Sequence, residues 1–470
     1  MGGVFPSHVR EKMIITYRNP SECSVSIPDG RRINPCLSYE AVYYKQGPYH
    51  KERKVYQANA LFSHKAYPHD VFFHTGLLRR IMNYCKEQNI SVEIAGKPKI
   101  LLTRDPNLNG ITFKEDQLRL IKKGLLHQRG QLISPTGTGK TIIGLAVLSS
   151  LPRNNRYLWT CHTKDLMYQT WEEARKFFPS VGRAGDGYKE TDKQIIVGIN
   201  KTLRGLMDNG MLPEVHGVIV DESHNISKLD NDYANLIFRM PCYFRIGLTA
   251  SPTTPEKDGE PGFASEGLLG PILGEFTIKE ATEKGILAKV SVRMIKIPID
   301  YDIKYIQKYK DAYEEGIVKR LDKLQAIAEV AAKHVNAGDS VLIMVTRRDH
   351  GENLGNVLAS MGVPCTYVHG DASGIFRNET KEKLNSKEIK CVIATVVWKE
   401  GINIPELNVI IYAGEGKGDR AVIQSIGRGT RITETKKVLI YYDIFDPSNS
   451  YFMEHFGLRF MLYCDLGWVT

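Results

Sequence analysis

The chain has 470 residues, of which 42% are hydrophobic and 25% charged, and its formal net charge is +10. This length predicts about two to four domains, and the composition is typical of a globular protein with complete hydrophobic cores. No run of about 18 apolar residues occurs, which excludes a membrane-spanning helix. The N-terminus lacks a signal peptide's apolar core, and Pro6 breaks the myristoylation pattern, so we expect a cytoplasmic protein, or one in the host-cell cytoplasm if a phage encodes it.

Residues 1–110 hold much of the positive charge, with sixteen Lys and Arg against nine Asp and Glu. The patterns predict a helix over Thr75–Gln88 and short strands at Met13–Tyr17, Leu37–Tyr44, Val92–Ile94 and Ile100–Leu102. Basic and aromatic residues alternate between them, which is a composition that can bind DNA phosphates and stack on bases. A second interpretation stays open, in which the aromatic residues form the core of a small domain. The candidate DNA contacts here are Arg53, Lys54, Lys65, Arg79 and Arg80.

From Ile111 onward, short apolar runs alternate with helical patterns, which predicts parallel sheets buried on both faces. The first set of strands is predicted at Gln131–Ile133, Tyr157–Cys161, Gln194–Ile199, Gly217–Val220 and Phe244–Leu248. The second set is predicted at Ser340–Val345, Cys365–His369, Cys391–Thr395, Val409–Ala413 and Val438–Tyr442. Thr253–Gly274 has the composition of a loop, and Ile303–Ala337 has a helical pattern.

The predicted fold class is therefore α/β, with two tandem parallel-sheet domains and a small α+β N-terminal domain. The predicted limits are 1–110 for the basic accessory domain, 111–288 and 289–450 for the two α/β domains, and 451–470 for an amphipathic tail. The eight Cys residues form no Cys-x-x-Cys pair. Those in apolar stretches are expected to be buried thiols rather than disulfides or zinc ligands, namely Cys161, Cys242, Cys365 and Cys391.

The stretch Pro135–Thr141, Pro-Thr-Gly-Thr-Gly-Lys-Thr, lies between a predicted strand and a predicted helix. Such a turn directs backbone N–H groups and a helix N-terminus at one point, where nucleotide phosphates bind. Lys140 would contact the terminal phosphates, and Thr141 would hold Mg²⁺. The usual pattern has Gly where Ser134 stands, and Ser adopts such turns less freely than Gly.

Two further motifs carry candidate chemistry. Asp221 and Glu222 follow an apolar strand, where Asp221 can hold Mg²⁺ through water and Glu222 can position and deprotonate the attacking water. In Gln424–Arg431, Arg428 and Arg431 are three residues apart and share one helix face. A planar guanidinium suits a transferring phosphate, so these Arg side chains would contribute if the two sheets face each other across the nucleotide.

Taken together and in this order, the motifs of residues 111–450 resemble those of superfamily 2 helicases and translocases. The matching residues are Phe113 with Gln117, Ser134–Thr141, His162–Leu166 with Gln169, Val197–Leu203, Asp221–His224, Thr249–Pro252, Val341–Thr346, His369–Asp371, Ala394–Thr395 with Glu400–Pro405, and Gln424–Arg431. The resemblance implies two RecA-like domains that face an ATP cleft. It implies ATP and Mg²⁺ as cofactors.

The resemblance also implies roles for single residues. The catalytic ATPase residues would be Lys140, Asp221, Glu222, Gln424, Arg428 and Arg431. The ATP-binding residues would be Phe113, Gln117, Pro135, Thr136, Gly137, Thr138, Gly139, Lys140, Thr141 and Gly401. Thr141 and Asp221 would hold Mg²⁺, and the residues that couple hydrolysis to motion would be His224, Thr249 and Ser251. The contacts to strand phosphates would be Thr163, Lys164, Asn200, Lys201, Thr346, Arg347 and Thr395.

Differences from the usual superfamily 2 motifs indicate which subfamily the chain resembles most. Asn403 stands where the family usually has Asp, which leaves the role of that carboxylate in doubt. Asp-Glu-Ser-His at Asp221–His224, instead of Asp-Glu-Ala-Asp, favours DNA translocation over RNA melting. The compact core and small basic N-terminal domain look most like the UvsW-type bacteriophage branch-migration helicases, which remodel forks and branched DNA. The partners we expect are DNA, bound largely without sequence preference, and replication or recombination proteins, with no membrane. The chain would act as a monomer.

Three other functions stay open. The chain could be an RNA helicase, or a nucleic-acid-stimulated ATPase switch that unwinds nothing. It could also be the motor of a restriction system, although the sequence contains no nuclease-like carboxylate–Lys cluster outside the motor motifs.

Overall fold

The computed structural model describes residues 12–46, 51–226, 231–395, 404–416, 426, 432–433 and 436–469. The chain forms two compact units, Met1–Ile133 with Lys140–Glu275, and Ser134–Gly139 with Phe276–Thr470. Within these described ranges, no helix has both the length and the apolar character needed to span a bilayer. All eight Cys residues are free, and of the four predicted to be buried, Cys365 is only partly buried.

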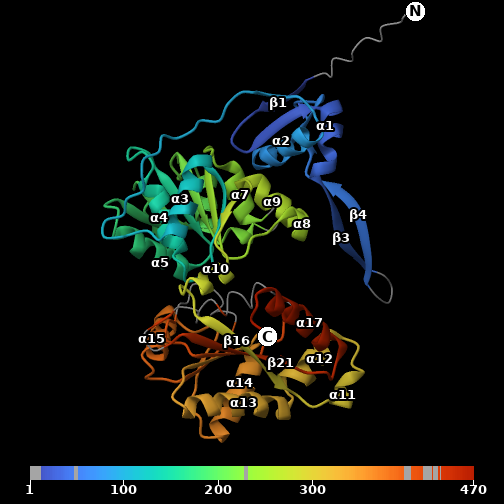
Figure 1. Cartoon of the computed structure of the whole chain (residues 1–470), viewed down its shortest axis with the longest axis vertical. Helices are drawn as coiled ribbons and strands as arrows, with labels where there is room; N and C mark the ends of the chain where they lie inside the picture. The colour runs from blue at the N-terminus through green and yellow to red at the C-terminus, as the bar shows by residue number, and fades with distance from the viewer. Residues whose placement is uncertain are drawn as a thin grey trace, which may run out of the picture. The chain divides into compact units, whose positions relative to one another are not determined.

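The N-terminal domain is an α+β domain built on a five-stranded sheet with the order β5-β6-β2-β1-β7 (Figure 1). One face of this sheet is buried, and accordingly Met13 and Ile15 of β1 are buried whereas Ile14 between them is exposed. The strands are β1 Met13–Tyr17, β2 Glu22–Ser26, β5 Phe62–Ser63, β6 Asp70–His74 and β7 Val92–Ala95. The helices are α1 Ile27–Ile33, η1 Asn34–Leu37, η2 Thr75–Leu77 and α2 Leu78–Glu87.

A separate two-stranded ribbon is formed by β3 Ser38–Gln46 and β4 Lys51–Asn59 (Figure 1). The two strands are antiparallel and pair over their whole length, from Ser38 opposite Asn59 to Gln46 opposite Lys51. The sequence prediction included β3 but missed β4, because the run of Lys, Glu and Arg in β4 hides its extended conformation.

The first α/β domain is built on an eight-stranded sheet with the order β11-β10-β12-β9-β13-β14-β8-β15, parallel except for β11. The central strands are buried along their whole length, because helices cover both faces. The strands are β8 Arg129–Ile133, β9 Tyr157–Cys161, β10 Val181–Gly185, β11 Tyr188–Lys189, β12 Ile195–Ile199, β13 Gly217–Asp221, β14 Phe244–Thr249 and β15 Ile272–Glu275. The helices are α3 Glu115–His127, α4 Lys140–Ser149, α5 Lys164–Arg175, α6 Asn200–Asp208, η3 Ser223–Asn225, α7 Asp232–Arg239, α8 Pro255–Asp258 and α9 Glu260–Leu269.

The second unit contains a six-stranded parallel sheet with the order β16-β21-β20-β17-β19-β18. The strands are β16 Lys289–Lys296, β17 Val341–Met344, β18 Thr366–Val368, β19 Cys391–Ala394, β20 Val409–Tyr412 and β21 Val438–Phe445. The helices are α10 Ile278–Glu283, α11 Tyr301–Lys304, α12 Tyr309–Tyr313, the π-helix η4 Glu314–Val318, α13 Leu321–Asn336, α14 Arg348–Ser360, α15 Gly374–Asn385 and α17 Ser450–Asp465. The predicted fold class, two parallel-sheet domains and an α+β N-terminal region, is therefore confirmed.

Some local predictions were wrong. Thr253–Gly274 is not a loop, because it contains α8, α9 and the start of β15. Its Gly residues permit close packing, since a Cβ at Gly262 would lie 2.0 Å from the carbonyl carbon of Thr254. Ile100–Leu102 forms no strand and instead packs on the first α/β domain, where Gln128 Nε2 donates to Leu101 O at 2.6 Å. The strands of the three sheets fall within 13–95, 129–275 and 289–445, and the exact domain limits stay predictions.

Two buried arginines join the N-terminal domain to the first α/β domain. Arg129 donates to Pro20 O and to Leu268 O, both at 2.7 Å. Arg245 donates to Ser21 Oγ and to Met240 O, both at 2.9 Å. The carbonyl acceptors from Met240 and Leu268 lie at helix C-termini, where the backbone carries partial negative charge. Among the described residues, neither guanidinium has a carboxylate partner, and burial lowers the pKa of Arg129 to about 9.

The docking also depends on a close backbone approach at Gly76. A Cβ at this position would lie 2.1 Å from Glu266 O and 2.6 Å from Gly267 O. Such distances allow no side chain, and the obstructing atoms belong to backbone that cannot rotate away. Gly76 therefore sets how closely η2 packs against α9.

We predict that Arg245→Met lowers the free energy of unfolding of the first unit by about 3 kcal/mol, because several buried carbonyl groups lose a charged donor. Arg239→Met is the control, since Arg239 is partly exposed and pairs with Asp208 at the surface. Thermal unfolding followed by circular dichroism measures both variants. Equal midpoints for the two variants would contradict the assigned role of Arg245.

Candidate active site

The predicted phosphate loop connects β8 to α4, so the N-terminus of α4 begins at Lys140. Gly137 has φ +88° and Gly139 has φ +91°, a left-handed conformation that favours glycine. Ser134 is not left-handed, so the loop needs no Gly there. The Ser134 and Thr138 hydroxyl oxygens lie 2.5 Å apart, and Thr138 Oγ1 donates to Pro135 O at 2.7 Å. These bonds hold the loop in a turn that suits phosphate binding.

Asp221 and Glu222 lie at the carboxyl end of β13, on the same domain as Lys140. Lys140 Nζ is 3.8 Å from Glu222 Oε1, and both side chains are mostly buried. Glu222 has φ +46°, a left-handed conformation that costs a residue with a Cβ roughly 1 kcal/mol. The structure therefore brings the three predicted residues together, and backbone strain fixes the direction of Glu222.

Burial raises the pKa of the Asp221 carboxyl to about 7, with a further contribution from the charge of Glu222. Lys140 lowers this pKa only partly. Glu222 Oε2 is buried and accepts no hydrogen bond of normal geometry from the described residues, although an imidazole nitrogen, His224 Nδ1, lies 3.4 Å away. Two adjacent carboxylates with one ammonium group leave an excess of negative charge, which fits a divalent cation held by Asp221.

A chain of polar contacts leads from Glu222 to the next strand. Glu222 Oε2 is 3.4 Å from His224 Nδ1, which lies 2.9 Å from Thr249 Oγ1 at the end of β14. Thr249 Oγ1 accepts from Ser251 N at 3.2 Å. The three residues predicted to couple hydrolysis to motion are therefore in direct contact, next to the carboxylate that would position water.

Four of the residues predicted to contact the phosphates of a nucleic-acid strand lie close together. Thr163 and Lys164 follow β9, and Asn200 and Lys201 follow β12, a parallel neighbour in which Ile199 pairs with Cys161. The N-termini of α5 and α6 therefore meet at one edge, where helix N-termini favour phosphate. Lys164 Nζ forms an ion pair with Asp186, so a DNA phosphate would have to displace this carboxylate in order to bind Lys164.

The predicted contacts of the second unit have internal partners. Thr346 Oγ1 donates to Gly414 O at 3.3 Å, and Arg347 pairs with Glu314 at 2.6 Å and with Asp349. Thr395 follows β19 and is 8% exposed. Their contact with nucleic acid stays a prediction. Gly401, Gln424, Arg428, Arg431 and Asn403 lie outside the described residues.

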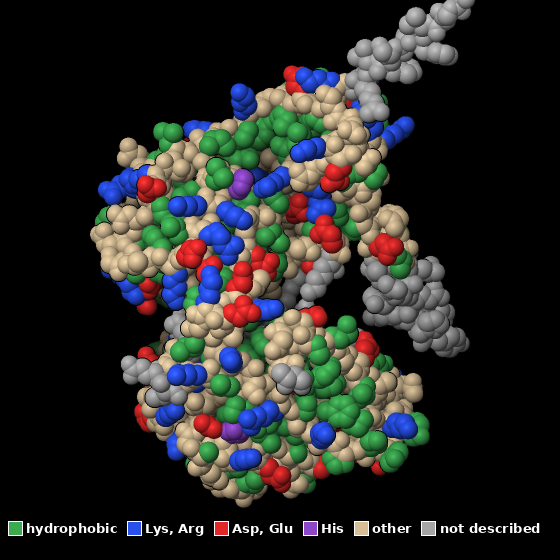
Figure 2. Space-filling model, in the orientation of Figure 1, with side chains coloured by type: hydrophobic (Ala, Val, Ile, Leu, Met, Phe, Trp, Pro, Cys, Tyr) green, Lys and Arg blue, Asp and Glu red, His purple; other side chains and the backbone are tan. Residues whose placement is uncertain are grey.

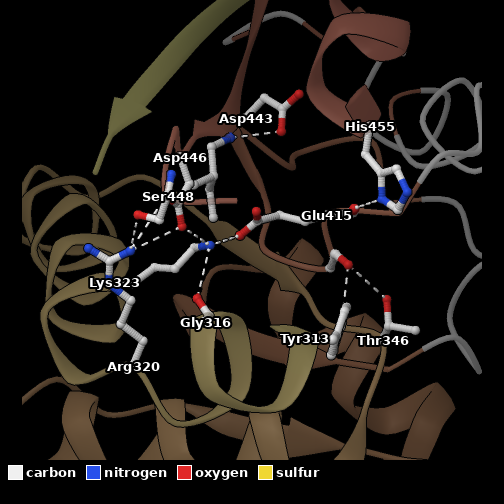
Figure 3. Close-up of polar contacts among 12 residues, drawn as sticks. Tyr313, Gly316, Arg320, Lys323, Thr346, Glu415, Asp443, Asp446, Ser448 and His455 are labelled. Carbon is white, nitrogen blue, oxygen red and sulfur yellow. Dashed lines mark hydrogen bonds and ion pairs between the residues drawn. The ribbon is translucent and has the colours of Figure 1, made fainter. Parts of the chain in front are cut away.

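The turn Gly414–Gly416 after β20 is held from several sides (Figure 3). Tyr313 OH donates to Gly414 O at 3.1 Å, and His455 Nδ1 lies 3.1 Å from Glu415 O. The Glu415 carboxylate is 2.5 Å from the fully buried Lys323 Nζ, which also contacts Asp446 at 2.8 Å. Arg320 also pairs with Asp446, at 3.3 Å, so each carboxylate has a cationic partner. These buried contacts fix the turn that precedes the segment with the predicted Arg428 and Arg431.

The N-terminal candidates differ in their surroundings. Arg53 and Lys54 lie on β4 opposite Tyr44 and Tyr43, and their side chains are outside the description. Lys65 and Arg79 are exposed. On the face shown in Figure 2, Lys and Arg side chains lie among Asp and Glu side chains and form no single basic surface.

Arg80 was also predicted to contact DNA. Its guanidinium binds Glu266 and Glu256 of the first α/β domain through Nε and Nη2. Contact of Arg80 with DNA stays a prediction, and DNA would have to compete with these two carboxylates.

At the predicted adenine site, Lys114 N donates to Gln117 Oε1 at 3.0 Å, so Gln117 caps α3. Contact of Phe113 and Gln117 with adenine stays a prediction.

Sequence analysis missed Gln131 and Tyr233, which support the acidic pair. Tyr233 OH donates to Asp221 O at 3.0 Å, and Gln131 Oε1 accepts from Ser223 Oγ at 3.4 Å. The available signal for Gln131 was its polar side chain directly before the apolar pair Leu132-Ile133 of the predicted strand.

Comparisons with known proteins agree with this arrangement. The family model "Type III restriction enzyme, res subunit" matches residues 110–254, and "Helicase conserved C-terminal domain" matches residues 321–433. The DNA 3'-5' translocase XPB2 of Sulfurisphaera tokodaii is 24% identical over 410 residues, which cover 77% of this chain and 88% of the relative.

Two solved structures are similar to this chain to different degrees. S. cerevisiae Dbp5 bound to RNA and ADP BeF3 is 16% identical, with a TM-score of 0.54, over 76% of this chain and 93% of that one. This likeness shows the fold alone, two RecA-like domains. T4 UvsW is 17% identical, with a TM-score of 0.43, over 97% of this chain and 98% of that one.

We predict that the Mg²⁺ concentration for half-maximal ATP turnover rises about tenfold between pH 8 and pH 6, because protons compete with the cation for Asp221. A carboxyl with a pKa near 7 is mostly ionised at the higher pH and mostly neutral at the lower. Titrations at constant free ATP measure this. A flat profile would mean that Asp221 is not a cation ligand.

Proposed function

The chain belongs to superfamily 2 of helicases and translocases, and we propose that it uses ATP hydrolysis to move on DNA and to unwind or remodel branched DNA. Such an activity would carry out fork regression and branch migration during DNA replication, recombination or repair. The observation that carries the proposal is the assembly of Lys140, Asp221 and Glu222, with the link from Glu222 through His224 to Thr249.

The chain's own residues divide the work of hydrolysis. Lys140 would leave Glu222 and bind the terminal phosphates, which frees that carboxylate to orient and deprotonate water. Thr141 and Asp221 would hold Mg²⁺, which supplies charge neutralisation at the phosphates. The loss of Lys140 as a neighbour changes the charge beside His224, and this change can reach Thr249 and Ser251 through hydrogen bonds. Gln424, Arg428 and Arg431 are proposed as the catalytic residues of the second unit.

DNA is the proposed substrate for two reasons. The Asp-Glu-Ser-His motif departs from the motif of RNA-melting relatives, and one relative that aligns over most of both chains is described as a DNA translocase. The alternative of an RNA helicase has support from the fold shared with an RNA-bound protein and from a partial relative described as a putative ATP-dependent RNA helicase. A nucleic-acid-stimulated switch without unwinding is the third possibility, and only a strand-movement assay separates it from a motor.

We predict that forked DNA and four-way junctions stimulate ATP turnover more than single-stranded DNA or RNA. Lys140→Ala should lower kcat by about 100-fold or more with DNA affinity unchanged, because the lysine acts on the phosphates. Lys122→Ala, an exposed residue of α3, is the control and should be fully active. Stimulation by RNA alone would identify an RNA helicase, and turnover without strand displacement or branch migration would identify a switch.

The N-terminal ribbon is proposed as a DNA contact through Arg53 and Lys54. Replacing both with Ala should reduce the slope of log affinity against log salt by about 2, since each phosphate contact contributes roughly one counterion. Arg31→Ala/Lys97→Ala removes the same charge from other exposed positions of the N-terminal domain and should leave the slope unchanged. Fluorescence anisotropy with a labelled fork measures the slope. Equal slopes for both double variants would remove the ribbon from the DNA-binding surface.

A further inference from the structure

Arg80 of α2 forms a clamp with two carboxylates of the first α/β domain. Its Nη2 lies 2.8 Å from Glu266 Oε2 and 2.6 Å from Glu256 Oε1, and its Nε lies 3.1 Å from both oxygens of Glu266. The guanidinium also lies over the ring of Phe263, 5.5 Å from its centroid. Glu266 is nearly buried, whereas Glu256 is exposed. The geometry matches the planar fork of arginine, so lysine could not reproduce it.

The buried end of this clamp is connected to the acidic motif. Glu266 follows Ser265 in α9, and Ser265 Oγ donates to Gln131 Oε1 at 3.2 Å. The same oxygen accepts from Ser223 Oγ at 3.4 Å, and Ser223 follows Glu222 directly. Ser223, Ser265 and Gln131 are all buried. Gln131 lies on β8, the strand that leads into the phosphate loop, so its side chain joins that strand, the acidic motif and α9.

The exposed end of the clamp is connected to the same site by the chain itself. Glu256 lies in α8, which begins four residues after Ser251. Thr254 N donates to Asp258 Oδ2 at 2.9 Å, which fixes the start of this short helix. A displacement of Ser251 would therefore move α8 rather than be absorbed by a loose loop.

The clamp is not the only contact that docks the N-terminal domain. The buried residues Arg129 and Arg245 and the close approach at Gly76 also dock it. Arg80 instead borders a cavity of about 500 Å³, also lined by Arg79, Asn83 and Thr253. This space gives the guanidinium room to rearrange, which the buried arginines do not have.

We propose that Arg80 and Glu266 are positioning residues that transmit the state of the ATP site to the N-terminal domain. Nucleotide that repositions Glu222 and Ser223 shifts α9 through Gln131, and the shift of Glu266 turns α2 through Arg80. Coupling between two sites is reciprocal, so DNA held by the N-terminal domain changes the ATP site by the same route. This inference rests on the proposed function, because it requires that nucleic acid stimulates ATP turnover.

The test is the isosteric variant Glu266→Gln, with ATP turnover measured with and without forked DNA. The ratio of stimulated to basal turnover should fall about fivefold, while turnover without DNA and fork affinity without nucleotide change by less than about twofold. The effect of a non-hydrolysable ATP analogue on fork affinity should fall by the same factor. Glu260→Gln on α9 and Lys86→Ala on α2 are the controls, and both exposed residues should leave the ratio unchanged.

Arg80→Lys provides a second variant that keeps the charge but loses the bidentate geometry. It should reduce the ratio as well, and combining it with Glu266→Gln should add nothing, since both act on one contact. A lower unfolding midpoint with an unchanged ratio in either variant would show that the pair is only structural and would overturn the inference. If no nucleic acid stimulates the unaltered protein, the proposed function fails and the inference with it. Stimulation that persists in both variants refutes the inference alone.

Discussion

The docking of the N-terminal domain depends on the buried guanidinium groups of Arg129 and Arg245, which pair with no carboxylate in the part of the chain that the structure describes. Burying a charge is costly unless hydrogen bonds replace its water, and here carbonyl groups at helix ends supply that replacement. Both arginines belong to the first α/β domain and reach across to Pro20 and Ser21. The sheet that carries the acidic motif therefore also holds the N-terminal domain in place, which makes communication between them physically direct.

A second constraint recurs at the carboxyl ends of the strands. Glu222 after β13 and Glu415 after β20 both have a left-handed backbone, with φ +46° and +50°. Each of these glutamates precedes a segment with predicted functional residues. A lysine contacts the carboxylate in both cases, Lys140 at Glu222 and Lys323 at Glu415. The environments differ, because Lys323 contacts three buried acceptors whereas the contact of Lys140 with Glu222 is long, at 3.8 Å. The first pair is thus free to exchange partners, and the second is a fixed support.

The sequence predicted the parallel sheets well, because nearly continuous apolar runs such as Tyr157–Cys161 are typical of strands covered on both faces. It also located the phosphate loop and the acidic pair, since spacing along the chain determines their place at strand ends. Sequence analysis did not predict features that depend on contacts between residues far apart in the chain. The charged strand β4 has no apolar signal, and the ion pairs of Arg80 join residues about 180 positions apart. No local pattern distinguishes such an arginine from one that binds phosphate.

Gly76 offers a way to recognise this architecture in other sequences. Its contacts with α9 are to backbone atoms, so every chain that docks the domain in this way must have glycine at the equivalent position, whatever its surface residues. A relative with a larger residue there must hold its N-terminal domain at a different distance or angle. The residue at this one position therefore indicates how the accessory domain of a related motor packs on its first α/β domain, whichever nucleic acid that motor binds.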